Sequence, residues 1–266
     1  ERTEDAIRLI RAYHLRLAST DNPEDPRLRQ LRAFLANYGF DLAPPIPAAL
    51  VERIEAARGC AAKVRDRFST DGWAALGDLA RTARAMTQTA KPGDDAARAM
   101  SVLLRKITGF SGLVHENMYR FSGWHFLSFG RALERADALA AMLSTFADPD
   151  APTGALDIAI EVADSTITHQ RRYRMERSRE SVVDLLALDG DNPRAILFQI
   201  ERLRRLAADM PYARDNGRLG ALSRAIVPIE SRLSVAMPEE IDSEALLALR
   251  PEIAIISDLL VQNYLR

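Results

Sequence analysis

Apolar residues recur every three to four positions along most of this chain, and strict alternation of apolar and polar residues is absent. That spacing is typical of α-helices that bury one face. Residues that end or begin helices, above all Pro, Gly, Asn and Asp, separate the periodic stretches. The pattern predicts an all-α fold, a helical bundle. We expect helices at 1–19, 26–39, 48–67, 73–89, 95–108, 113–146, 154–177, 194–209, 215–236 and 243–265.

Polar residues mark several of the expected helix ends. Asp25 before Pro26, Ser69 before Thr70 and Asn192 before Pro193 each predict an N-cap at the start of a helix. Pro251 is expected to kink or split the last helix, because proline removes a backbone hydrogen bond. Cys60, among alanine and arginine neighbours, is expected to be a small core residue.

Two charged residues interrupt an apolar face of the long helix expected at 113–146. Positions 124, 127, 131, 134 and 138 share one side of a helix and read Trp, Leu, Arg, Glu and Ala. We therefore expect Arg131 and Glu134 to point into the molecule, where buried charges require partners. Gly123 and Gly130 in the same helix are expected to mark the close approach of another backbone. These charges are either a structural lock or a functional site.

The chain contains an internal similarity. Glu1-Arg2 matches Glu134-Arg135, and the segment starting at Ile46-Pro47 matches the segment starting at Asn192-Pro193, in the same order. One explanation is chance similarity between amphipathic helices. The other is a duplication that gives two pseudo-symmetric helical halves, about 1–112 and 113–266, within a single domain spanning 1–266. The duplication would bring the two Glu-Arg pairs face to face.

The composition excludes several classes of function. With 36 basic and 37 acidic residues, the net charge is -1, so we expect neither nucleic acid nor a membrane surface as the partner. The single cysteine excludes an internal disulfide and a thiolate zinc site, and no Glu-x-x-His motif precedes any of the four histidines. We therefore expect no metal in this domain. No apolar run is long enough to span a bilayer, and no phosphate-binding loop is found.

Further candidates lie near the long helix and in the second half. Glu116, Arg120 and Trp124 follow one another at four-residue intervals, which places them on one helix face. The basic segment 169–174 is either a solvated helix end or a binding element. In the second case Arg172 or Tyr173 would contact acidic positions of the long helix, or a phosphate or carboxylate of a ligand.

Several short motifs, taken in order, resemble the bacterial alpha-E domain family. They are Phe126-Leu-Ser-Phe-Gly-Arg-Ala-Leu-Glu-Arg-Ala-Asp, Arg172-Tyr173, Val183-Asp-Leu-Leu-Ala-Leu-Asp and Asn192-Pro193-Arg-Ala-Ile-Leu-Phe-Gln-Ile. The resemblance covers nearly the whole chain. Two features depart from the family pattern: only Glu1-Arg2-Thr3-Glu4 remains of the first Gly-Arg-x-x-Glu-Arg element, and Ile46-Pro47 replaces the first Asn-Pro. We therefore expect the chain to be a fragment of a longer one.

The resemblance implies an all-helical, cytoplasmic, bacterial domain that works beside or fused to a circularly permuted ATP-grasp domain. The implied theme is ATP-dependent amide or peptide bond formation. ATP and Mg²⁺ would bind the partner ATP-grasp domain, so we expect no cofactor in the helical domain itself. The resemblance leaves the role of the helical domain open, including whether it is an enzyme.

Three hypotheses follow. In the first, the domain handles an amino-acid or peptide substrate: Arg131, Arg135, Arg2 and Arg172 hold an oxyanion, Glu134, Glu1 and Glu116 orient them or an attacking amine, and Tyr173 and Trp124 form walls. In the second, it is a structural or protein-interaction domain whose Glu-Arg pairs lock the helices. In the third, it is an independent enzyme with Glu134 as general base, although no nucleophile or metal ligand stands beside Glu134 in the sequence.

Overall fold

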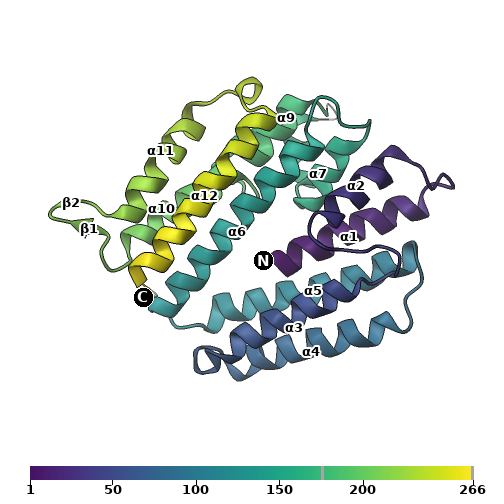
Figure 1. Ribbon diagram of the computed structural model, residues 1–266, viewed down its shortest axis with the longest axis horizontal. Coiled ribbons are helices and arrows are strands. Elements are labelled where there is room, and N and C mark those ends of the chain that lie inside the picture. The colour runs from purple at the N-terminus through teal and green to yellow at the C-terminus, as the bar shows by residue number, and fades with distance from the viewer. Residues whose placement is uncertain (175–176, 265–266) are drawn as a thin grey trace. The chain divides into compact units, whose positions relative to one another are not determined.

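The computed structural model describes residues 1–174 and 177–264 (Figure 1). It is helical apart from one short hairpin and connecting segments, so the predicted all-α class is confirmed. The chain forms two compact units, Glu1–Tyr119 (unit 1) and Arg120–Arg266 (unit 2). Among the described residues, no helix is sufficiently long and apolar to span a bilayer.

Unit 1 is a bundle built around the pairing of its first and last long helices. Its elements are α1 (Arg2–Ala18), α2 (Pro26–Ala36), α3 (Ala48–Ala62), the 3₁₀ turn η1 (Arg65–Arg67), α4 (Thr70–Thr87) and α5 (Asp94–Asn117). Helix α1 packs on α5, α4 packs on α5, and α3 packs on α4. Aliphatic side chains from these helices fill the core, including Ile7, Ile10, Leu31, Leu35, Leu50, Ile54, Leu79, Met100 and Leu103.

Unit 2 contains the longest helix and several short ones. Its elements are α6 (Ser122–Phe146), α7 (Ala155–Val162), α8 (Thr166–Tyr173), α9 (Arg179–Val183), the π-helix η2 (Asp184–Leu188), α10 (Ile196–Ala208), β1 (Arg214–Asp215), β2 (Arg218–Leu219), α11 (Ala221–Val235), η3 (Pro238–Glu240) and α12 (Ser243–Tyr264). Helix α6 packs on α10 and α12, and α11 packs on both α10 and α12. The core includes Phe129, Phe146, Ile158, Leu185, Ile200, Ile226 and Ile256.

The two units pair their helices in the same order. In unit 1 the first helix packs on the last, α4 packs on α5, and α3 packs on α4. In unit 2 α6 packs on α12, α11 packs on α12, and α10 packs on α11. A duplicated helical unit would give these corresponding pairings, and the duplication stays a prediction.

Two of the expected N-caps form. The Asp25 carboxylate accepts a hydrogen bond from the backbone N–H of Arg27 at 2.8 Å, with Pro26 in the first turn of α2. The Ser69 hydroxyl accepts from the backbone N–H of Gly72 at 3.0 Å. The third expectation is wrong, because α10 begins at Ile196 and Asn192 is not its N-cap.

Several helix boundaries differ from the expected ones. No break occurs near Gly109 and Gly112: α5 continues to Asn117, because Ile107 and Val114 keep one face buried across the glycines. The expected helix at 154–177 is two helices, separated at 163–165, and residues 175–176 lie outside the described part. The helix expected to reach residue 67 ends at Ala62.

The structure also tests the predictions for Pro251 and Cys60, and it contains two elements that were not predicted. Helix α12 runs from Ser243 to Tyr264 without a split at Pro251, and residue 265 lies outside the described part. Helix α9 and η2 were not expected, although Ser178 is an N-cap residue and caps α9. Cys60 lies on α3 but is exposed, so its expected place in the core is wrong.

Candidate functional site

The candidate residues of α6 lie on its half-exposed side. Trp124, Arg131, Glu134 and Arg135 are each partly buried, whereas the buried face of the helix carries Phe129 and other apolar residues. The expectation that Arg131 and Glu134 point into the core is therefore wrong. The buried face is rotated away from them, because positions 129, 132, 133, 136, 139 and 140 form a continuous apolar face.

The flanking contacts of α6 fix its position within unit 2. The guanidinium of Arg250 on α12 forms a bidentate pair with Asp137, with Nε–Oδ1 and Nη2–Oδ2 distances of 2.8 and 3.0 Å. Arg120 lies over the ring of Trp124 at 4.4 Å.

The prediction for Gly130 is wrong. In the described part of unit 2, no atom outside its own stretch of helix lies within 4 Å of a Cβ built on Gly130, so no other backbone approaches closely there.

In α1, the buried charges are not the expected ones. Glu1 precedes the helix and is half-buried, and Arg2 is exposed. One turn later, the side chains of Glu4 and Arg8 are only 3% and 2% exposed, and Arg8 Nη2 lies 2.9 Å from Glu4 Oε1. The sequence signal for this pair is the four-residue spacing of Glu4 and Arg8 beside Ile7, which places all three near one face. Whether Glu1-Arg2 and Glu134-Arg135 meet stays a prediction.

Glu116 is not on the helix where we expected it. It lies exposed near the end of α5 in unit 1, whereas Arg120 and Trp124 belong to unit 2. The expected row of Glu116, Arg120 and Trp124 on one helix face is therefore wrong. The chain leaves helical geometry at Met118 and resumes it at Ser122.

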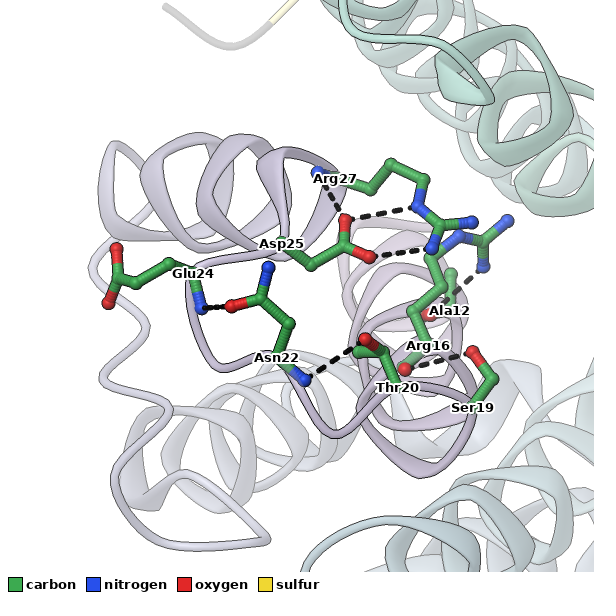
Figure 2. Close-up of polar contacts among 8 residues, drawn as sticks. All are labelled: Ala12, Arg16, Ser19, Thr20, Asn22, Glu24, Asp25 and Arg27. Carbon is green, nitrogen blue, oxygen red and sulfur yellow. Dashed lines mark hydrogen bonds and ion pairs between the residues drawn. The ribbon is translucent and has the colours of Figure 1, made fainter.

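The turn between α1 and α2 is a polar cluster in unit 1 (Figure 2). Asp25 receives the Arg27 guanidinium at two atoms, with Nε–Oδ1 and Nη2–Oδ2 distances of 3.0 and 2.6 Å. These hydrogen bonds from Arg27 lower the pKa of Asp25 to about 2. Arg16, which is buried, donates to the carbonyl of Ala12 at 2.9 Å. This cluster caps α2 and fixes the turn.

Arg172 and Tyr173, both expected as binding residues, meet two carboxylates that follow α9. Arg172 contacts Asp184 and Asp189, with Nη–Oδ2 distances of 3.1 and 2.6 Å, and the Tyr173 hydroxyl donates to Asp184. Burial raises the pKa of the Tyr173 phenol, and the hydrogen bond to Asp184 raises this pKa further. Their acidic partners lie in and after η2 rather than on α6, so the expected contact with the long helix is wrong.

A cavity of about 360 Å³ opens beside this cluster within unit 2. Its described lining residues are Tyr173, Ser178, Glu180, Ser181, Asp184 and Pro238, and all but Pro238 carry a polar group on the side chain. The backbone N–H of Glu180 and the Ser178 hydroxyl lower the pKa of the Glu180 carboxyl. The cavity thus brings together carboxylate, hydroxyl and phenol groups from α8, α9 and η2, which suits a small polar ligand.

A buried histidine lies behind the cavity wall. His169 Nε2 is 3.0 Å from the Oγ of Ser181, and the His169 ring stacks at a tilt on Tyr173 with 5.0 Å between centroids. Burial lowers the pKa of His169, and the charge of Arg177 lowers this pKa further. The sequence analysis included His169 only as part of the basic segment 169–174 and missed Ser181 and Asp184, because their meeting depends on α9 and η2.

The Asn-Pro motif joins η2 to the start of α10. Asn192 is buried and donates from Nδ2 to the carbonyl of Leu185 at 2.9 Å, while its Oδ1 accepts from the backbone N–H of Arg194 at 3.0 Å. Gln199 then donates to the carbonyl of Pro193 at 2.7 Å. The motif holds the π-helical segment that carries Asp184. Among the described residues, no three His, Cys, Asp or Glu side chains are grouped as metal ligands would be.

Comparison with known proteins identifies relatives of this chain and the family to which it belongs. Uncharacterized proteins of two strains of Mycobacterium tuberculosis and of Mycobacterium bovis are each 30% identical to it over 228 residues, or 82% of this chain. The match covers 25% of each relative, so the chain spans about a quarter of their length. No solved structure matches. The family Alpha-E, described as "a predicted alpha-helical domain with a conserved ER motif", matches residues 1–265, and the chain therefore belongs to the Alpha-E family.

Proposed function

We propose that this domain is the substrate-handling module of an ATP-grasp-linked system that forms amide or peptide bonds. The main support for the proposal is the cavity of unit 2, which carboxylate, hydroxyl and phenol groups line. Asp184, one of the lining residues, contacts both Arg172 and Tyr173. The mycobacterial relatives are about four times as long as the matched region, which supports a domain that works within a larger protein. ATP and Mg²⁺ bind the partner domain, in a bacterial cytoplasm.

The candidate residues take distinct roles in this proposal. Arginine binds oxyanions through two parallel N–H groups, so Arg131, Arg135 and Arg172 of unit 2 hold the carboxylate or phosphate of an amino-acid or peptide substrate. Glu134 orients these arginines or the attacking amine. Arg2 and Glu1 belong to unit 1, and their part in substrate binding stays a prediction from the sequence. Tyr173 and Trp124 provide apolar walls. Glu116 has no role here, because it lies exposed near the end of α5.

The test uses the full-length protein that contains this domain, supplied with ATP, Mg²⁺ and a set of amino acids and short peptides. We expect ADP release coupled to amide formation, and its loss in Glu134→Ala with unchanged circular dichroism. Glu244→Ala is the matched control, because Glu244 is an exposed carboxylate on α12 outside the proposed site. An unchanged ligation rate in Glu134→Ala would contradict the proposal.

A second candidate function is a structural or protein-interaction domain. It is favoured by the way Arg172, Tyr173, Asp184 and Asp189 satisfy one another, as a helix lock would. In that case the double variant Arg131→Leu, Glu134→Leu should be neutral or stabilising, because both side chains are half-buried and apolar residues can pack in their place. A stable double variant that loses ligation would reject this candidate.

A further inference from the structure

Ser181 and His169 form a buried pair at the wall of the unit 2 cavity. Ser181 is 9% exposed and lines the cavity, and His169 is 1% exposed behind it. The 3.0 Å separation of Ser181 Oγ and His169 Nε2 is that of a hydrogen bond between a hydroxyl and a base. A nucleophile that faces a cavity, with a base behind it, is the arrangement that acyl transfer requires.

Among the described residues, at least two groups can accept the hydroxyl hydrogen of Ser181. Ser181 Oγ accepts a hydrogen bond from the backbone N–H of Ser178 at 3.2 Å, as part of the cap that starts α9. The hydrogen itself can go to the Ser178 carbonyl at 2.9 Å or to His169 Nε2. The Ser178 carbonyl already accepts from the backbone N–H of Val182. The capping role therefore leaves the hydroxyl able to donate to His169.

The surroundings keep His169 in the form that can accept this proton. Burial is the main cause that lowers the pKa of His169, so the imidazole is neutral near pH 7. The aromatic contact with Tyr173 holds the ring from the α8 side. In the tautomer that carries its proton on Nδ1, the neutral imidazole presents Nε2 to the Ser181 hydroxyl and is competent as a general base.

We propose that Ser181 is an acyl-accepting nucleophile with His169 as its general base. Ser181 takes the acyl group of an acyl phosphate and passes it to an amine. This inference rests on the proposed function and deepens it. In the first step Ser181 Oγ bonds to the carbonyl carbon, His169 takes the hydroxyl proton and gives it to the phosphate, and the phosphate leaves with the electrons of the broken C–O bond. In the second step the amine bonds to the same carbon, His169 takes a proton from the amine nitrogen and gives it to Ser181 Oγ, the ester C–O bond breaks, and an amide forms.

Charges around the cavity match these reactants. Arg172 pairs with the wall residue Asp184 and with Asp189, and it exchanges one of these carboxylates for the leaving phosphate. Glu180 and Asp184 line the cavity and provide acceptors for the N–H groups of an incoming amine. The cavity of about 360 Å³ is large enough for a small acyl group and an amine.

The experiment treats the 266-residue chain with acetyl phosphate or p-nitrophenyl acetate and locates the acetyl group by peptide mass spectrometry. Lysine occurs only at 63, 91 and 106, so acetylation of peptides from residues 120–266 cannot be on lysine. We expect one acetyl group on Ser181 that hydroxylamine removes, as it does for an ester. A chain without acetyl on Ser181, or with the label on Ser178, would overturn the proposal.

Matched variants separate catalysis from folding. His169→Asn should slow acetylation of Ser181 by about 10²-fold or more, since general-base catalysis contributes at least that much. Ser234→Ala removes an exposed hydroxyl on α11 outside the cavity and should leave the Ser181 label in place. An unchanged rate in His169→Asn would refute the role of His169. Failure of this labelling overturns the Ser181 assignment alone, because the ligation assay with Glu134→Ala tests the proposed function separately.

Discussion

At the scale of single residues, the orientation of each side chain decides which charges are buried. Glu4 and Arg8 are buried while Arg2 is exposed, because Ile7 and Ile10 set the face of α1 that enters the core. The sequence places a Glu-Arg pair at the start of a helix, but the same dipeptide also occurs at 52–53 and 201–202. Which charges enter the core depends on how each helix rotates to bury its largest apolar residues.

Asp25 is expected to stabilise unit 1 through its cap and its pair with Arg27. Asp25→Ala removes both and should cost about 1 kcal/mol or somewhat more of unfolding free energy at pH 7, the usual cost of losing an N-cap. Asp25→Asn keeps a cap and should cost less. Chemical denaturation measures both. Equal losses in the two variants would contradict a contribution from the cap, and no loss in Asp25→Asn would contradict a contribution from the ion pair.

The same residue gives unit 1 a dependence on acid. Arg27 lowers the pKa of Asp25 from 3.8 to about 2, so the folded state binds this proton less readily than the unfolded state. The stabilisation is therefore present above about pH 4 and is lost as the pH falls toward 2. Asp25→Asn should show a shallower loss of stability over this range than the parent chain.

His14 gives unit 1 a second dependence on pH, nearer neutrality. Its Nδ1 accepts from the backbone N–H of Gly93 at 3.3 Å, its Nε2 lies 2.9 Å from the Pro45 carbonyl, and the Tyr13 ring packs against it edge to face. Burial lowers the pKa of His14, so the unfolded state binds the proton more tightly. Stability should be full above about pH 6.5 and fall below it, by at most about 1.4 kcal/mol per pH unit.

The check is a series of denaturation curves between pH 5 and 8 for the parent chain, His14→Gln and His169→Asn. His14→Gln should lose this component of the pH dependence, whereas His169→Asn should keep it, because His169 belongs to unit 2. Identical pH slopes in the parent chain and His14→Gln would refute the role of His14.

At the scale of elements, α5 shows that glycine is a weak signal for a helix end. Gly109 and Gly112 have helical backbone and no atom within 4 Å of an added Cβ. Alanine at either position should therefore stabilise the chain by about 0.5–1 kcal/mol, measured by thermal or chemical unfolding. Gly93, with φ +82°, is the contrasting site, because alanine there should destabilise. A loss of stability in Gly109→Ala would contradict this assignment.

The helices that the sequence predicts well are those with strong start signals and one continuous apolar face. Asp25 and Ser69 locate α2 and α4 in this way. The segment 179–188 could not be predicted, because its π-helical turn is held by a tertiary contact, the bond from Asn192 to the Leu185 carbonyl. Arg172 and Tyr173 were predicted from the sequence as candidate site residues, which stays a prediction, and their contacts with Asp184 depend on that segment.

At the scale of the whole molecule, the chain divides between Tyr119 and Arg120 rather than at the glycines near residue 112. Each unit buries its own core of aliphatic residues. The sequence analysis placed the division near residue 112, because the helices expected at 95–108 and 113–146 leave Gly109 and Gly112 between them. The boundary follows two buried residues at the end of unit 1. These are Val114, near the end of α5, and Met118, just after it.

Two fragments cut between Tyr119 and Arg120 are therefore expected to fold separately. Residues 1–119 and 120–266 should each show helical circular dichroism and a cooperative thermal transition, because each contains the helices that pair around its core. A fragment that is helical but melts without cooperativity, or that remains unfolded, would contradict this prediction for that unit.

The matched control is a fragment of residues 1–112, which ends at the division expected from the glycines. It lacks Val114 and Met118, which are buried in the intact chain, and the last turn of α5. Full burial of each such side chain is worth about 1.5–3 kcal/mol, so the shorter fragment should be less stable than 1–119 by about 3 kcal/mol or more. Equal stability of the two fragments would show that residues 113–119 do not belong to the core of unit 1.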